Sequence, residues 1–168
     1  MKSLKKTALL GSLAGALLIG APASAQMVER INPPIPGVSI ASGTAVPSGY
    51  MTYYLSGALP TPVTPAANGK PPVFGDTAAQ TRSVLDNLKA VMDKFGIGYG
   101  DVVAAHVFLD PKADFMAMNK VWATEFGTAA QPNKPARATV FVHALVAPGA
   151  LLEIEFTAVK KIPAAKKK

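Results

Sequence analysis

The 168-residue chain contains no cysteine and only two histidines, His106 and His143. Without cysteine the protein has no thiol nucleophile, no disulfide and no cysteine-ligated metal site. His106 falls within one apolar run and His143 near the end of another, so we interpret both as structural and expect no metal site. Stability must then come from packing or from oligomerisation.

The part of the chain expected to fold also lacks an excess of charge. The formal net charge is +7, but residues 26–159 contain nine Lys or Arg and ten Asp or Glu, a net of −1. A body without a basic face is not expected to bind nucleic acid. The Lys-rich tail, residues 160–168, is interpreted as a solvated end, with contact to anionic surfaces as the alternative.

No apolar run is long enough for an ordinary transmembrane helix. Residues 7–21 form the longest run, about 15 residues against the ~20 that a spanning helix needs. They follow the basic start MKSLKK and precede Ala23-Ser24-Ala25, the layout of a secretory signal peptide. We expect cleavage after Ala25, no transmembrane segment in the mature chain, and a periplasmic or secreted protein. An uncleaved anchor is the alternative.

The sequence lacks internal repeats and the common catalytic motifs. It has no P-loop, dinucleotide-binding glycine pattern, serine elbow or metal-ligand spacing. The 143 residues from Gln26 onward are enough for one domain with a core of its own. Function must therefore be sought in individual residues placed by the fold.

The hydrophobic pattern predicts two helices and four strands after a Pro-rich extended arm at residues 26–38. One helix begins at the capping residue Asp76 and ends at Gly96, with Val84, Leu88, Val91 and Phe95 at helical spacing. The second helix is expected at 111–127, with Phe115, Met118, Trp122 and Phe126 on one stripe. The strands are expected at 48–57, 101–110, 136–145 and 151–159, and a long loop at 58–76.

This order indicates an α+β sandwich in which two helices cover one face of a single sheet. Arg137, Thr139, Glu153 and Glu155 are expected on the other face. An uncovered face with apolar residues and few charges is best hidden by oligomerisation.

Arg137, with Glu153 and Glu155, is the candidate site. The guanidinium matches a carboxylate in a bidentate way, and a nearby Glu can orient or deprotonate a water. The alternative is a structural Arg–Glu ion pair at a subunit contact. A tight hairpin at residues 147–149 would leave Glu153 ~16 Å from Arg137. Either the two strands are not neighbours, or the site is completed across an interface.

Four segments, AQTRSVLDNLKAV (79–91), DFMAMN (114–119), PARATV (135–140) and EIE (153–155), closely resemble the RidA/YjgF family of imine deaminases. The resemblance covers about residues 74–159, and a weaker match extends the domain back to Ser39. It implies a chorismate-mutase-like fold and a homotrimer with clefts between subunits. In that fold the last strand does not pair with its sequence neighbour.

The resemblance also implies a function. Members hydrolyse small enamines and imines, such as 2-iminopropanoate, 2-iminobutanoate or 2-aminoacrylate, to 2-oxo acids and ammonia without metal or organic cofactor. Arg137 matches the residue that holds the substrate carboxylate, and Glu153 the acid that positions the attacking water. The backbone amide at Thr139 is expected to help bind the carboxylate, and the remaining cleft positions are Asn119, Ser56 and Gly57.

Some positions depart from the family pattern. Ser42 stands where a cleft tyrosine is common, Ala58 replaces a glutamine, one residue is added in the strand 50–55, and the 58–76 loop is long. These changes leave the substrate open. A non-catalytic module that binds small carboxylates at Arg137 is the alternative function, and ribonuclease action is disfavoured by the near-neutral body.

Overall fold

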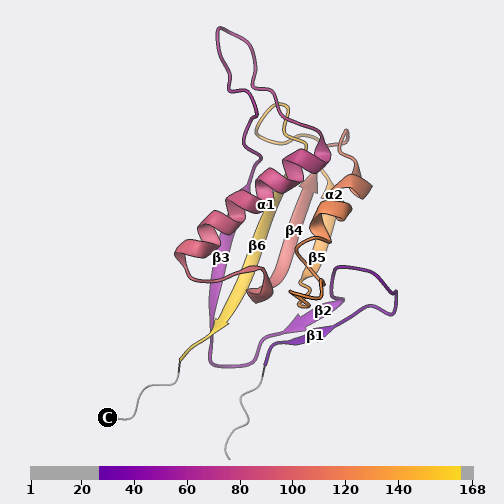
Figure 1. The fold of residues 1–168 in the computed structure, drawn as a ribbon, viewed down its shortest axis with the longest axis vertical. Helices are drawn as coiled ribbons and strands as arrows, with labels where there is room; N and C mark the ends of the chain where they lie inside the picture. Colours follow the sequence, from indigo (N-terminus) through magenta and orange to yellow (C-terminus); the bar gives the residue numbers. More distant parts are fainter. Residues whose placement is uncertain (1–26, 164–168) are drawn as a thin grey trace, which may run out of the picture.

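The computed structural model describes residues 27–163, so the predicted signal peptide and the last five residues of the tail lie outside it. Figure 1 labels the helices and strands and colours them along the sequence. In chain order the elements are β1 (Glu29–Ile31), β2 (Gly43–Ala45), β3 (Tyr50–Ala58), α1 (Thr77–Lys94), a 3-10 turn (Tyr99–Asp101), β4 (Val102–Leu109), α2 (Phe115–Trp122), β5 (Ala136–Phe141) and β6 (Leu152–Lys161).

The main body is a four-stranded sheet with the order β3-β6-β4-β5. β5 runs parallel to β4, and the other pairs are antiparallel. Both helices lie across the same face of this sheet (Figure 1). The predicted α+β sandwich is confirmed.

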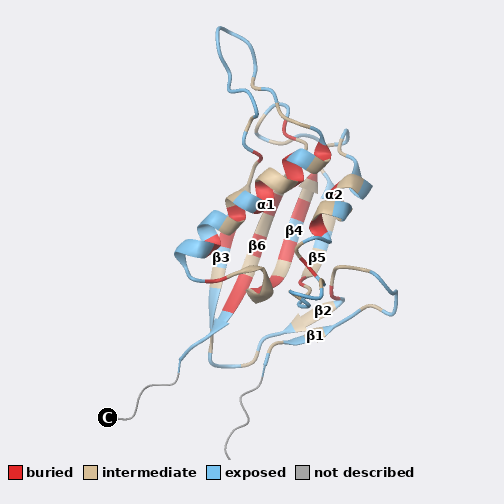
Figure 2. Cartoon of the chain, viewed as in Figure 1, coloured by how far each residue is buried: buried red, intermediate tan, exposed pale blue. Residues whose placement is uncertain are grey.

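The core lies between the sheet and the helices, where Figure 2 shows the buried positions of β4, β6 and α1. The strict alternation of β6 puts Leu152, Ile154, Phe156 and Ala158 in this layer, each at most 2% exposed. In α1 the buried stripe runs through Leu85 and Met92. The expected inward positions Val91 and Phe95 are 42% and 53% exposed, so that part of the predicted stripe was wrong.

Both helices begin at an aspartate cap. Asp76 accepts a hydrogen bond from the Ala79 amide at 2.8 Å, and Asp114 accepts from the Met116 and Ala117 amides at 2.8 and 3.0 Å. The second cap fixes the start of α2 at Phe115. The helix is therefore shorter than the predicted 111–127, although Trp122 and Phe126 are buried as expected.

The strand register decides which face each candidate residue occupies. Arg137 pairs with Ala105 and Thr139 with Val107, both buried under the helices. Glu155 instead pairs with His106 on the opposite face, as Glu153 does with Phe108. Placing all four candidates on the uncovered face was wrong for Arg137 and Thr139, because β4 separates β5 from β6 and sets their registers independently.

The N-terminal arm is attached to the body. β1 pairs antiparallel with β2 in a separate two-stranded sheet. The Arg30 guanidinium donates to the carbonyls of Val102 at 2.9 Å, Lys134 at 2.8 Å and Gly100 at 3.1 Å. These bonds fix the segment against the starts of β4 and β5.

The 58–76 segment folds into a projecting two-stranded turn, at the top of Figure 1. Bridges join Thr64 to Val73 and Ala67 to Lys70. Asn68 and Gly69 have φ angles of 52° and 74°, as a tight hairpin turn requires. Within residues 27–163, no helix has the length and apolar character to cross a membrane.

Candidate functional site

Arg137 is held by α2 and not by a carboxylate. Its Nη2 donates to Asn119 Oδ1 at 2.7 Å, and its Nη1 lies 3.9 Å from Met118 Sδ. The guanidinium carbon is 4.6 Å from the centre of the Trp122 ring. Among residues 27–163 no ion pair involves Arg137. The Arg–Glu pair at a subunit contact, considered from the sequence, stays a prediction.

The Arg137 cation is only partly satisfied. Its Nε is buried and has no hydrogen-bond partner among residues 27–163. Burial lowers the pKa of Arg137 to about 10, so the side chain stays charged at neutral pH. It lines a cavity of about 360 Å³ between α2 and residues 37–40. A buried cation that faces a cavity without a counter-ion is suited to bind an anion.

Thr139 lies two residues further along β5, on the same face as Arg137. Its hydroxyl oxygen is buried and has no partner in the described part of the chain. β5 is an edge strand of the four-stranded sheet. Asn119, Arg137 and Thr139 are called the arginine half-site below.

Glu153 lies on the open face of the sheet, next to Gly57. A Cβ built on Gly57 would lie 1.9 Å from Glu153 Oε1, so only glycine leaves room for the carboxylate in this position. Leu55 pairs with Phe156 and Ala58 with Ile154, so β3 has one extra residue between them, at Ser56 and Gly57. Ser56, Gly57 and Glu153 are called the glutamate half-site.

A cavity of about 340 Å³ adjoins the glutamate half-site. Glu153, Glu155 and Phe108 line it from the sheet, and its other walls come from the loop after β5, at Val142, Ala144, Leu145 and Val146. Glu155 Oε1 lies 2.6 Å from His106 Nδ1. Glu155 is thus engaged by a neighbour on its own sheet, which leaves Glu153 as the acid available to a ligand.

The two half-sites do not meet in one chain. Arg137 pairs with Ala105 and Glu153 with Phe108, so they are two strands and three residues apart, about 14 Å, and on opposite faces. The structure confirms that β5 and β6 are not neighbours, yet this does not bring the residues together. A single copy therefore presents two incomplete surfaces.

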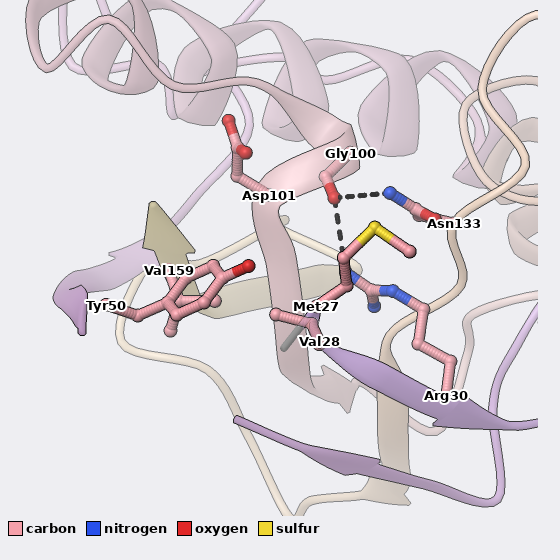
Figure 3. Close-up of a pocket in the computed structure, with 8 residues that line it drawn as sticks. All are labelled: Met27, Val28, Arg30, Tyr50, Gly100, Asp101, Asn133 and Val159. Atoms are coloured by element: carbon pink, nitrogen blue, oxygen red, sulfur yellow. Dashed lines mark hydrogen bonds between the residues drawn. The ribbon is translucent and has the colours of Figure 1, made fainter. Parts of the chain in front are cut away.

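A third cavity, of about 260 Å³, lies where the N-terminal strand meets the body (Figure 3). The Arg30 guanidinium is occupied by three backbone carbonyls, and burial lowers the pKa of Arg30. Asp101 accepts a bond from the Gly98 amide at 2.9 Å. These charged groups already have structural partners, so this cavity is not the candidate site.

Sequence reasoning missed two features that surround the arginine half-site. Trp122 and Met118 were assigned to the core from their spacing, which could not show that they also contact a cation. The wall at residues 37–40 carries no motif, since residues 37–38 end the predicted arm and residues 39–40 begin the predicted domain. Of the departures from the family pattern, Ser42 is exposed and Ala58 packs against the core; neither lines the cavities beside Arg137 or Glu153. Within residues 27–163 no group of three or more His, Asp or Glu could hold a metal ion.

Comparisons with known proteins agree with this architecture. The family model described as Endoribonuclease L-PSP matches residues 43–160. The 3-aminoacrylate deaminase RutC of Acinetobacter baylyi is 41% identical over 101 residues, 60% of this chain and 73% of that protein. Protein DfrA of Myxococcus xanthus is 40% identical over 114 residues, 68% and 79% of the two chains.

Solved structures give the same result. The Rid-family protein YyfB of Yersinia pestis superposes with a TM-score of 0.61 at 26% identity, covering 79% of this chain and 98% of that one. A putative endoribonuclease of Thermotoga maritima superposes with a TM-score of 0.53 at 30% identity, covering 82% and 99%. The chain belongs to the Endoribonuclease L-PSP family, which includes the RutC and YjgF/Rid proteins.

Proposed function

We propose that the protein is a cofactor-free hydrolytic deaminase that converts 2-imino acids and their enamine tautomers to 2-oxo acids and ammonium. The observation that carries this proposal is Arg137, a partly buried cation that lines a cavity and has no carboxylate partner among residues 27–163. A substrate carboxylate would supply the missing charge and accept the unused guanidinium donors.

The chemistry needs few groups because an iminium carbon is already electrophilic. Arg137 fixes the carboxylate, with Asn119 orienting the guanidinium. Glu153 accepts a proton from a water molecule while the oxygen of that water adds to the iminium carbon. The resulting carbinolamine takes that proton back on nitrogen, the C–N bond breaks, and the hydroxyl proton leaves with ammonia. The products are one 2-oxo acid and one ammonium ion.

The proposal requires the arginine half-site of one copy to meet the glutamate half-site of another. The two surfaces lie on different faces of one chain, as a repeated cyclic contact demands. Tyr54 and Val140 lie on the open face and are 82% and 48% exposed in the single chain, and Val146, above Glu153, is 86% exposed. Burying them between copies favours assembly. We propose a homotrimer with three such sites.

The names of relatives point to two activities, deaminase and endoribonuclease. The charge distribution favours the deaminase. Residues 26–159 have a net charge of −1, whereas binding to a phosphate backbone depends on several cations on one surface. A single arginine among apolar side chains fits a small carboxylate better than it fits a phosphate backbone.

The test generates imines in situ with an amino-acid oxidase and follows their decay by semicarbazide trapping. The wild-type protein should shorten the imine lifetime. Arg137→Ala should lower kcat/KM by about 10²–10⁴-fold, because removing one partner of a desolvated charge pair costs about 3–5 kcal/mol. Arg82→Ala is the matched control, since Arg82 is a more exposed arginine that pairs with Glu125 at 2.7 Å and lines neither cavity.

Sedimentation separates catalysis from assembly. Arg137→Ala should keep the trimer and lose activity, whereas loss of the trimer would show that Arg137 acts in the interface. Wild-type protein that does not accelerate imine decay would overturn the proposal. Saturable binding of 2-oxo acids without turnover would then identify the chain as the non-catalytic carboxylate-binding module.

A further inference from the structure

The cavity beside Arg137 has few polar side chains in its wall. Its charged and amide groups, Arg137 and Asn119, lie together and are bonded to each other at 2.7 Å. The carbonyl of Ser39 accepts a bond from Trp122 Nε1 at 2.9 Å. Gly37 and the Ser39 side chain also line the cavity. The remaining side chains of the wall are largely apolar, and they are Val38, Ile40, Phe115, Met116, Trp122 and Ala123.

This apolar wall is poorly covered. Phe115 is 40% and Met116 62% exposed, side by side at the start of α2. The cavity of about 360 Å³ lies within the usual size range for small-molecule pockets, about 300–1,000 Å³. A substrate whose carboxylate lies on Arg137 and whose side chain is a methyl group leaves most of that wall in water. A longer apolar side chain would bury it.

We infer that the preferred substrates are 2-imino acids with branched aliphatic or aromatic side chains, larger than methyl and uncharged, which lie against Val38, Phe115 and Met116. The inference rests on the proposed function, because it takes Arg137 as the carboxylate anchor. The anchor fixes the direction in which the side chain leaves the carboxylate. The apolar wall then favours substrates whose side chains are large and apolar.

Binding can be measured without catalysis, using the product 2-oxo acids and calorimetry on the full chain. We expect 4-methyl-2-oxopentanoate to bind about tenfold to fiftyfold more tightly than pyruvate, because three further carbons are partly or wholly buried. We expect 2-oxoglutarate, which has similar length and a second charge, to bind more weakly than 4-methyl-2-oxopentanoate. Equal affinity for all three, or no binding at all, would overturn the inference.

Val38→Thr tests the wall itself, because threonine keeps the shape of valine and adds a hydroxyl. It should reduce the preference for 4-methyl-2-oxopentanoate over pyruvate by about fivefold. Val63→Thr, in the projecting loop where Val63 is 69% exposed, is the control and should leave the preference unchanged. If the cavity is instead filled by a second copy, Val38→Thr will change sedimentation and not the ligand ratio, and the inference fails.

Turnover distinguishes this inference from the proposed function. Imines made from leucine and phenylalanine should be hydrolysed with a kcat/KM at least about tenfold above the imine from alanine. Equal rates would refute the side-chain preference and leave the deaminase standing. Selective binding of 4-methyl-2-oxopentanoate without hydrolysis of any imine would refute the deaminase and leave the preference standing.

Discussion

Replacing Gly57 by alanine should abolish activity without unfolding the protein. The added Cβ would lie 1.9 Å from Oε1, 2.8 Å from Cδ and 3.1 Å from Cγ of Glu153. Gly57 does not have a positive φ, so its backbone accepts alanine. The collision involves only the free end of the Glu153 side chain, which must therefore rotate away from its place on the open face.

The structural cost and the catalytic cost differ widely. Moving Glu153 to a less favourable rotamer costs about 0.5–1.5 kcal/mol, against about 5–15 kcal/mol of total stability. Replacing a glycine in a strand recovers part of this cost. Misplacing a catalytic group by about 1 Å costs about a hundredfold in rate. We expect unfolding free energy to change by less than about 1.5 kcal/mol and kcat/KM to fall by about a hundredfold or more.

The imine-trapping assay and denaturant unfolding measure these two quantities on the same samples. Glu153→Ala and the double variant complete a cycle. If Gly57 acts through the carboxylate, adding Gly57→Ala to Glu153→Ala should cause no further loss of activity. Full activity in Gly57→Ala, or a further hundredfold loss in the Glu153→Ala background, would refute this reasoning.

Three other predictions test the fold and the N-terminus. Arg30→Ala removes hydrogen bonds to three backbone carbonyls, of which Gly100 keeps a bond from Asn133 Nδ2 at 2.9 Å. It should cost about 2–4 kcal/mol, seen as a fall of roughly 5–10 °C in Tm by scanning calorimetry. An unchanged Tm would show that the N-terminal strand is not fastened by this residue. Burial, helped by nearby Glu125, raises the pKa of Tyr99 well above its usual value. The unfolded chain therefore loses the phenol proton at a lower pH than the folded one, so the free energy of unfolding should fall as pH rises above about 10. In denaturant unfolding at pH 9–11, Tyr99→Phe should lose less stability with rising pH than the wild type. Protein recovered from the periplasm or medium should begin at Gln26 by mass spectrometry, and an intact N-terminus would support the uncleaved anchor instead.

Local patterns predicted the elements that depend on local chemistry. The alternation in β6 identified its buried face, because successive side chains of a strand point to opposite sides. Asp76 and Gly96 bound α1, since a capping carboxylate and a glycine at positive φ act within one turn of the helix. Arg137 was singled out from sequence, and the structure places it beside Asn119 and a cavity.

The arrangement of the half-sites could not be predicted in the same way. Whether Arg137 and Glu153 share a face depends on the pairing of β5 with β4 and of β4 with β6. These contacts join residues far apart in sequence, and a shift of one residue would exchange the faces. Val91 and Phe95 were mispredicted for a similar reason. More than one stripe of α1 is apolar enough to be buried, and contact with the sheet decides which stripe faces the core.

The segment between β1 and β2 is a loop that is held at both ends. Its ends are joined by the pairing of Ile31 with Gly43 and fastened to the body through Arg30, while residues 37–40 form one side of the cavity. The family match begins at residue 43, so residues 37–40 lie outside the part of the chain that the family model covers. The segment is also held from within, because Trp122 Nε1 donates to the Ser39 carbonyl at 2.9 Å and the amide of the buried Ala41 donates to the Pro135 carbonyl at 2.8 Å. Substitutions at the exposed residues 34–36 should therefore disturb the body less than substitutions at Ser39 or Ala41.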